Sequence, residues 1–347
     1  MITIRKTKFN VNSTEGRLLL LVLLSEISTL VSGSTGDRTQ FFRNCRENCE
    51  RTNCSLNGKE IQEQAVKFYK QSIFDLITQW TCADECQYAC MWRTVFAFFE
   101  RGWPIPQFYG KWPFCRLMGM QEPASVFFSL LNFLMHLRML RKFRREVRDD
   151  SPCYILCHIF GLTSLNGWIW SSIFHTRDNP LTELLDYACG YAVVLSCLYC
   201  MIMRMLHRYS LFLRGVITLA FVSYYINYFA YLSLGKLNYS FNMKVNVCTG
   251  LLSAVGWFIW CHQVRTRRPY FRRILRFYVL FALAMSLELF DFPPILWILD
   301  AHALWHLSTI PLVSVYYNFM IEDCCTLRKE KALKGDYSLA YTYNKNI

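Results

Sequence analysis

The sequence has few charged residues, and it lacks the continuous basic face that a nucleic-acid-binding protein presents. Asp, Glu, Lys and Arg make up 18% of its 347 residues, whereas 53% are hydrophobic and 16% are aromatic. A single soluble core does not need so many apolar residues. The formal net charge is +13, but because the basic residues are not spread along one soluble face, this charge does not indicate nucleic-acid binding. The composition predicts a polytopic membrane protein.

The apolar residues form blocks of about twenty, the length that crosses roughly 30 Å of hydrocarbon. They predict an all-α membrane protein whose main domain, 122–322, is a seven-transmembrane helix bundle. The predicted spans are 123–140, 152–174, 183–205, 211–233, 245–262, 274–291 and 300–321. Pro293 and Pro294 interrupt the last apolar run, and since proline cannot continue a helix, they predict a tight re-entry. A six-span count is the alternative.

Basic residues are scarce in alternate joints between these spans. The joints after the first, third and fifth spans and the C-terminal segment hold most of them: Arg138, Arg141, Lys142, Arg144, Arg145, Arg148, Arg204, Arg208, Arg214, Arg265, Arg267, Arg268, Arg272, Arg273, Arg276, Arg328, Lys329, Lys331 and Lys334. The intervening joints offer only Arg177, Lys236 and Lys244. The positive-inside rule therefore places the basic joints and the C-terminal tail, 323–347, in the cytosol.

The N-terminal segment, 1–33, resembles a cleavable signal peptide. Four basic residues precede the leucine-rich segment 18–24, and small residues follow around position 32. An uncleaved anchor is the alternative, because Glu26 interrupts the apolar run. Either arrangement delivers the following segment, 34–121, to the lumen.

Segment 34–121 is predicted to be a separate, cysteine-rich luminal domain. In an oxidising lumen its cysteine spacing indicates disulfides. The four-residue repeat within each of two groups would place the cysteines on one face of each of two helices. The paired CxxC knuckles of a zinc cluster are absent, which makes zinc the weaker alternative. Cys115 is the candidate for an unpaired thiol, and the sequence leaves open how the other six pair: Cys45, Cys49, Cys54, Cys82, Cys86 and Cys90.

Two N-glycosylation sequons fall on the predicted luminal side. Asn53 begins the triplet NCS, and Asn238 begins the triplet NYS. Because such triplets are common by chance, they give only weak support to the topology.

The chain has seven histidines, and three of them are predicted to lie at luminal ends of spans. His175 ends the second span, while His302 and His306 begin the seventh and, four residues apart, share a helix face. Three imidazoles suit Zn²⁺ and leave a coordination position open, which implies catalysis. The other four lie in or beside cytosolic halves, where a partly wet imidazole needs no special role: His136, His158, His207 and His262.

Two further polar residues lie near the predicted metal site. Ser171 precedes His175 by one helical turn, and Asp186 lies about two turns into the third span, after the helix-start signal of Asn179 and Pro180. Ionisable groups inside a span are costly and usually functional. We therefore predict Asp186 and Ser171 to be catalytic.

Four other carboxylates lie near the luminal ends of the spans. Asp300 is the candidate for orienting a ligand imidazole. Asp178 and Asp291 are equally interpretable as cap or turn residues, and Glu288 could pair with a neighbouring polar group.

These motifs resemble those of a known superfamily. The segments SSIFH (171–175) and DAHALWH (300–306), together with Asp186, are similar to the three motifs of seven-span hydrolases that include the alkaline ceramidases and the progestin and adipoQ receptors. Within that group, the chain resembles the family of post-GPI-attachment to proteins factor 3. The segments that carry this resemblance are WTCADECQYACMW (80–92), PQFYGKWPF (106–114), QEPAS (121–125), FHTRD (174–178) and FDFPP (290–294). In the last of these, Phe290 stands where leucine is expected.

The resemblance implies an enzyme of GPI-anchor remodelling that hydrolyses the sn-2 acyl ester of GPI-anchored proteins, a phospholipase A2-type reaction. It implies Zn²⁺ held by His175, His302 and His306, with Asp186 orienting or deprotonating water and Ser171 donating a hydrogen bond. It also implies that GPI-anchored proteins and their lipid are the partners, in the Golgi membrane or, as the alternative, the endoplasmic reticulum. A ceramidase-like amidase and a non-enzymatic receptor or scaffold with structural zinc are the other interpretations.

Overall fold

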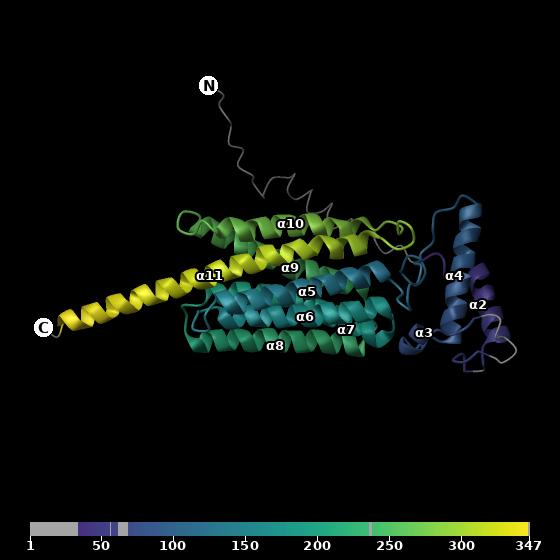
Figure 1. The fold of residues 1–347 in the computed structure, drawn as a ribbon, viewed down its shortest axis with the longest axis horizontal. Helices are drawn as coiled ribbons and strands as arrows, with labels where there is room; N and C mark the ends of the chain where they lie inside the picture. Colours follow the sequence, from purple (N-terminus) through teal and green to yellow (C-terminus); the bar gives the residue numbers. More distant parts are fainter. Residues whose placement is uncertain (1–33, 56, 62–68, 236–237, 346–347) are drawn as a thin grey trace, which may run out of the picture.

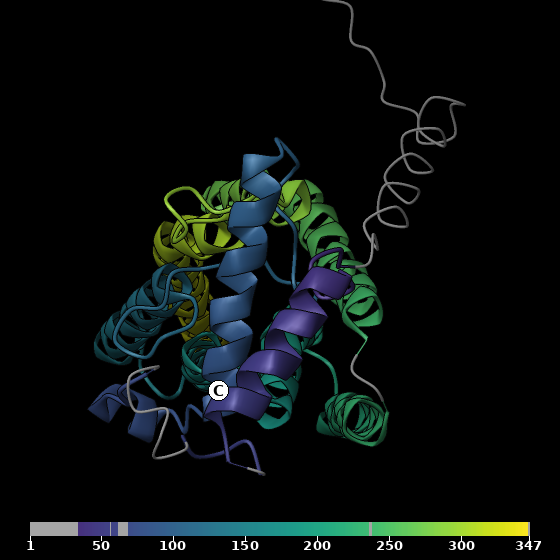
Figure 2. The same cartoon turned by 90° about the vertical axis from the view of Figure 1, so that its right-hand side faces the viewer.

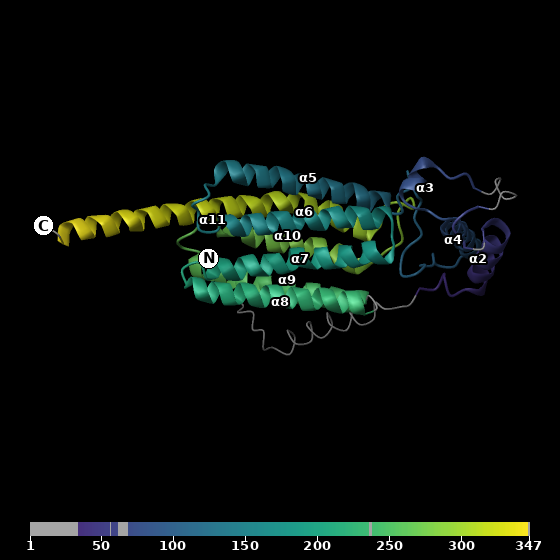
Figure 3. The ribbon, with the colours of Figure 1, turned by 90° about the horizontal axis from the view of Figure 1, so that it is seen from below.

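The computed structural model describes residues 34–55, 57–61, 69–235 and 238–345 (Figure 1). Within these ranges the chain forms ten helices and isolated β-bridges, and no strand. Three helices form a small domain at one end of a bundle of long helices, and the last helix extends past the opposite end (Figures 1 and 3). The all-helical prediction is confirmed for these residues, whereas the predicted signal peptide lies outside them.

The N-terminal domain consists of α2 (Gln40–Asn53), the short α3 (Ile73–Ile77) and α4 (Cys82–Glu100). Each begins at a hydroxyl cap: Thr39, Ser72 and Thr81 accept hydrogen bonds from backbone N–H groups of the first turn. These caps satisfy donors that helix starts leave unpaired.

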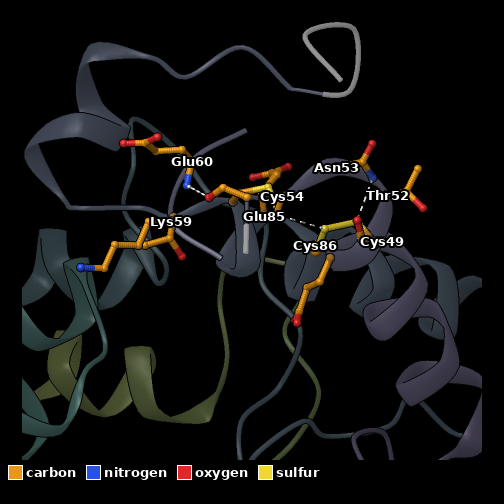
Figure 4. Close-up of a disulfide and its surroundings, with 12 residues drawn as sticks. Cys49, Thr52, Asn53, Cys54, Lys59, Glu60, Glu85 and Cys86 are labelled. Carbon is orange, nitrogen blue, oxygen red and sulfur yellow. Dashed lines mark hydrogen bonds between the residues drawn. A yellow bond between two sulfur atoms is a disulfide. The ribbon is translucent and has the colours of Figure 1, made fainter. Parts of the chain in front are cut away.

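Three disulfides join α2 to α4. They pair Cys45 with Cys90, Cys49 with Cys86, and Cys54 with Cys82, and Figure 4 shows the middle one at the helix interface. The nested order is what antiparallel helices require, because residues early in α2 face residues late in α4. The prediction that these six cysteines form disulfides and that Cys115 stays unpaired is confirmed.

Each predicted span corresponds to one long helix. These helices are α5 (Pro123–Glu146), α6 (Tyr154–Thr176), α7 (Pro180–Met205), α8 (Leu211–Leu234), α9 (Tyr239–Val264), α10 (Phe271–Phe290) and α11 (Ala301–Lys345). By length and composition, α5, α7, α8 and α9 are able to cross a membrane. The seven-span count stays a prediction, because α6, α10 and α11 do not qualify on the same basis.

Local sequence signals set the helix boundaries around the site. Asn179 caps α7 and Pro180 occupies its first turn, as predicted. At the other boundary, α10 ends where Asp291 adopts a left-handed backbone (φ 32°), and Pro293 and Pro294 separate it from α11, so the predicted break between these two helices is confirmed. Helix α11 continues to Lys345, so that the predicted tail, 323–347, is helical throughout its described part.

The basic joints lie at the end of the bundle opposite the N-terminal domain (Figure 1). A buried ion pair ties α7 to α11 there, since Arg204 Nη2 donates to Asp323 Oδ1 at 2.7 Å and the Tyr270 hydroxyl donates to the same oxygen at 2.6 Å. Viewed along the bundle, α8 stands at its outer edge, and most of its side chains are exposed (Figure 2).

The N-terminal domain lies across the other end of the bundle, with α2 and α4 directed across the bundle helices (Figures 1 and 2). Arg177 Nη2 pairs with Asp84 Oδ2 at 2.6 Å. The loop before α11 is held as well, because the backbone N–H of Cys115 donates to the Trp297 carbonyl at 2.8 Å. The domain is therefore attached directly to the helix ends where the predicted metal site lies.

Candidate metal centre

Three imidazoles from distant parts of the chain converge at this end of the bundle. His175 ends α6, whereas His302 and His306 occupy successive turns at the start of α11. Each offers a ligand atom within 4.8 Å of the others. His175 and His306 are 2% and 1% exposed, while the His302 side chain is 33% exposed. The three-histidine group is therefore enclosed by protein around His175 and His306 and accessible at His302.

The inner nitrogens of the rings face one another. The Nε2 atom of His302 lies 3.4 Å from Nε2 of His175 and 2.9 Å from Nε2 of His306. A neutral imidazole nitrogen without a hydrogen is an acceptor, and two acceptors cannot bond to each other. A single proton would satisfy only one pair of rings. A metal ion coordinated by all three nitrogens satisfies the whole set.

The outer nitrogens all have partners that orient the rings for such an ion. His175 Nδ1 lies 2.7 Å from Glu122 Oε2, and His302 Nδ1 lies 2.7 Å from Glu288 Oε2. In a ring whose Nε2 binds a metal, Nδ1 carries the hydrogen and donates it to a carboxylate or hydroxyl. The two carboxylates therefore hold both rings in the tautomer and direction that metal binding needs.

Serine replaces a carboxylate at the third ring. His306 Nδ1 lies 2.8 Å from Ser129 Oγ, and Ser129 Oγ lies 3.2 Å from Ser171 Oγ. If Nδ1–H donates to Ser129, the Ser129 hydroxyl is free to donate to Ser171. The Ser171 hydroxyl then remains available to donate to a bound substrate. Ser171 thus lies beside the site, connected to His306 through Ser129.

Asp186 lies in α7, one helix away from His175, and is half-buried. Helix α7 packs against α6, the helix that carries His175. No side chain in the described residues donates a hydrogen bond to the Asp186 carboxylate, so this carboxylate is free to accept a proton or a hydrogen bond from a ligand.

Asp300 does not have the role predicted for it. Its Oδ1 accepts the backbone N–H of Ala303 at 2.8 Å and so caps the start of α11. The imidazole beside it, His302, already donates Nδ1–H to Glu288. Asp300 acts as a cap because a carboxylate just before a helix start is best placed for the unpaired N–H groups of the first turn.

Lys111 connects the N-terminal domain to the site. Its Nζ atom lies 2.7 Å from Glu122 Oε1 and 2.9 Å from Asp178 Oδ2. Burial would raise the pKa of the Glu122 carboxyl, but the Lys111 ammonium beside it outweighs that effect and the pKa lies well below its usual range. Asp178 lies in the turn between α6 and α7, as one interpretation of the sequence had it, and its side chain also forms an ion pair with Lys111.

The remaining predicted residues lie away from the site. Asn238 caps α9 from an exposed position, and Asn53 donates its amide N–H to the Cys49 carbonyl at 3.0 Å; glycosylation of either residue stays a prediction. His136 is 4% exposed, so it is buried among aromatic rings where a partly wet imidazole was expected.

Sequence reasoning missed Glu122, Ser129 and Lys111. The signal for Glu122 was its position immediately before Pro123, at a helix start on the same side as His175. Lys111 lies within the segment PQFYGKWPF (106–114) that carries the family resemblance, but no role was assigned to it, and Ser129 carried no signal in the local pattern. Glu288, by contrast, was expected to pair with a neighbouring polar group, and it pairs with His302.

Comparison with known proteins shows similarity over most of the chain. The model of the Per1-like family matches residues 72–324. A protein of Drosophila melanogaster named post-GPI attachment to proteins factor 3 is 78% identical over 298 residues, which cover 86% of this chain and 91% of that protein. Two mammalian relatives are named GPI-specific phospholipase A2-like PGAP3. The Mus musculus protein is 42% identical over 315 residues and the Homo sapiens protein 40% identical over 313, each match covering 89% of this chain and 95% of the relative.

Proposed function

Because the chain belongs to the Per1-like family, we propose that it hydrolyses the sn-2 acyl ester of GPI-anchored proteins in a phospholipase A2-type step of GPI-anchor remodelling. The names of its relatives supply the substrate class. The observation that carries the chemistry is the convergence of three Nε2 atoms whose rings are each held by an oxygen at Nδ1. The similarity of the same motifs to ceramidases and adipoQ receptors supports a shared hydrolytic centre.

The proposed ion is Zn²⁺, which His175, His302 and His306 would hold. Three imidazoles and no thiolate are a donor set that suits it. When bound, zinc supplies a Lewis acid for the ester carbonyl and makes a water molecule acidic enough to attack near neutral pH.

In this proposal Asp186 takes the proton of the attacking water. The water oxygen forms a bond to the carbonyl carbon of the ester, and the bond from that carbon to the glycerol oxygen breaks. Asp186 then passes the proton to the departing glycerol oxygen, giving a fatty acid and a lyso-GPI-anchored protein. Its carboxylate has no hydrogen-bond donor among the described residues and lies on a helix that packs against the one carrying His175, which supports this role.

Ser171 is assigned the stabilisation of negative charge on the carbonyl oxygen. The hydrogen-bond chain from His306 through Ser129 leaves its O–H without an internal acceptor, so it can donate to the oxygen on which charge develops.

The proposal also includes the topology. The bundle would span a Golgi membrane, or that of the endoplasmic reticulum, seven times, with the N-terminal domain luminal and the C-terminus cytosolic. The position of the basic joints at the far end of the bundle supports this orientation. The lipids of GPI-anchored proteins occupy the luminal leaflet, so the site would meet its substrate without lipid flipping.

The test compares the fatty acids of GPI anchors by mass spectrometry in cells lacking this chain and in cells supplied with variants. Wild-type protein and the control His262→Ala, an exposed histidine at the other end of the bundle, are expected to restore removal of the sn-2 chain. His302→Ala is expected not to restore it, at equal protein level. Full restoration by His302→Ala would falsify the catalytic assignment, and a change in ceramide with unchanged anchors would indicate an amidase.

A further inference from the structure

A single ammonium group from the cysteine-rich domain touches the carboxylate that orients a predicted metal ligand. Lys111 belongs to the segment between α4 and α5, outside the bundle. Its Nζ atom is 2.7 Å from Glu122 Oε1, and the other oxygen of the same carboxylate is 2.7 Å from His175 Nδ1. One carboxylate is therefore bonded on both sides, to a cation from the domain and to an imidazole of the bundle.

The Lys111 ammonium compensates the buried negative charge of the Glu122 carboxylate. Glu122 is 7% exposed, and a buried carboxylate without a charged partner is strongly unfavourable. Burial would lower the pKa of Lys111, but Glu122 and Asp178 outweigh it and raise that pKa above its ordinary value. Lys111 is thus a permanent cation at neutral pH. Its ammonium also lies 4.1 Å from the ring centre of Phe174, the neighbour of His175.

A tight turn that belongs to the N-terminal domain holds Lys111 in place. Phe108 and Lys111 exchange two backbone hydrogen bonds of 2.8 and 2.9 Å, and the turn between them requires glycine at Gly110, where φ is +81°. The Phe108 ring packs 5.2 Å from that of Phe42 in α2. The lysine backbone is thereby fixed to the disulfide-bonded helices while its side chain reaches the bundle.

We propose that Lys111 is a positioning residue of the metal centre, which holds Glu122 in the orientation that receives Nδ1–H of His175 and so couples the cysteine-rich domain to the ligand geometry. The inference rests on the proposed function only in that the three imidazoles bind a metal ion. It assigns to the cysteine-rich domain a part in building the site, in addition to any contact with substrate.

The experiment measures zinc affinity of the purified full-length protein by competition with a chelator, alongside thermal unfolding. Lys111→Met keeps the length and apolar stem of the side chain but removes the charge, and we expect it to weaken zinc binding 10- to 100-fold, the usual effect of losing support behind a ligand. Lys111→Arg should recover most of that affinity. A double variant, Lys111→Met with Glu122→Gln, should bind no more weakly than Glu122→Gln alone, because Lys111 acts through that carboxylate.

The matched control is Arg177→Met. Arg177 also joins the two parts of the chain by an ion pair, to Asp84 at 2.6 Å, but it does not contact Glu122, so zinc affinity should stay within threefold of wild type. Equal losses of affinity and of unfolding temperature in Lys111→Met and Arg177→Met would show that Lys111 is only a tether, and would overturn the inference.

Two further outcomes separate this inference from the proposed function. Wild-type protein that binds one zinc ion, with Lys111→Met binding as tightly, overturns the role of Lys111 and leaves the metal centre standing. Wild-type protein that binds no zinc overturns the metal centre itself. If Lys111→Met does not fold, Asp178→Asn decides the matter: it leaves the contact of Lys111 with Glu122 intact, so a tenfold loss of zinc affinity would contradict the inference.

Discussion

Two buried serines one turn apart on α5 allow a sharp test of the metal centre. Ser129 is fully buried and Ser125 is 1% exposed. Ser129 Oγ lies 2.8 Å from His306 Nδ1, whereas Ser125 Oγ is a buried hydroxyl without a hydrogen-bond partner among the described residues. Substitution by alanine at either position removes one hydroxyl oxygen from α5. At position 129 that oxygen contacts a predicted metal ligand, whereas at position 125 it has no hydrogen-bond partner among the described residues.

The expected magnitude follows from the hydrogen bond that is lost. With Nε2 of His306 on the metal, its Nδ1–H is fixed toward position 129, and Ser129→Ala leaves it buried and unpaired at a cost of about 1–3 kcal/mol. Without metal, the ring can change its tautomer and avoid that cost. The loss therefore falls on the metal-bound state, and zinc affinity should decrease about 5- to 150-fold. Ser125→Ala should leave the affinity unchanged, because no partner is orphaned.

The measurement is the zinc dissociation constant of the purified chain, from chelator competition, for wild type and both variants. Circular dichroism and thermal unfolding without metal should be alike for all three. Equal affinities for Ser129→Ala and Ser125→Ala would refute the reasoning, since the hydroxyl would then not support His306 in the bound state.

Three other outcomes are expected. Asp186→Asn should lower acyl-ester hydrolysis about 10²- to 10⁴-fold while the zinc content, measured by elemental analysis, stays at the wild-type value; loss of zinc would make Asp186 a ligand instead of a base. Burial would raise the pKa of the Asp75 carboxyl, but hydrogen bonds from Ser72 and Arg116 lower it to about 2. Because the pKa is lower in the folded than in the unfolded state, ionised Asp75 stabilises the folded protein by about 2 kcal/mol above pH 4. This stability should be lost as the pH falls toward 2. Denaturant titration should show this loss in wild type and not in Asp75→Asn. Gly161→Ala should destabilise the bundle by about 1–3 kcal/mol, because an added Cβ would lie 2.9 Å from the Tyr317 hydroxyl of α11. Gly190→Ala is the control and should not destabilise, because a Cβ there meets nothing within 4 Å. Comparison of the unfolding temperatures of the two variants checks this.

Local periodicity predicted much of this protein. The four-residue cysteine repeats anticipated two helices joined by disulfides, and apolar blocks anticipated a helix for every proposed span. Proline positions predicted both the start of α7 and the break before α11. These features depend on neighbours along the chain, because helix geometry brings residues i and i+4 together and proline acts on its own turn.

The partners of the histidines depended on the packing of separate helices. Glu122 lies 53 residues before His175 in the chain and yet bonds to it, and Ser129 lies 177 residues before His306. Such contacts are decided by how each helix is rotated about its axis and where it crosses its neighbours, which no local pattern specifies. Asp300 was misassigned for a different, local reason: it lies directly before α11 and caps that helix through the backbone N–H of Ala303.

Residue types and spacing by themselves pointed to the histidines that converge, His175, His302 and His306, and to the cysteines that form disulfides. Only the tertiary structure decided how those groups are held, through Glu122, Glu288, Ser129 and a lysine from another domain. The division has a physical reason, since imidazole and carboxylate chemistry is a property of the residue, whereas the direction of a ring is set by hydrogen bonds across helices that the folded chain alone brings together.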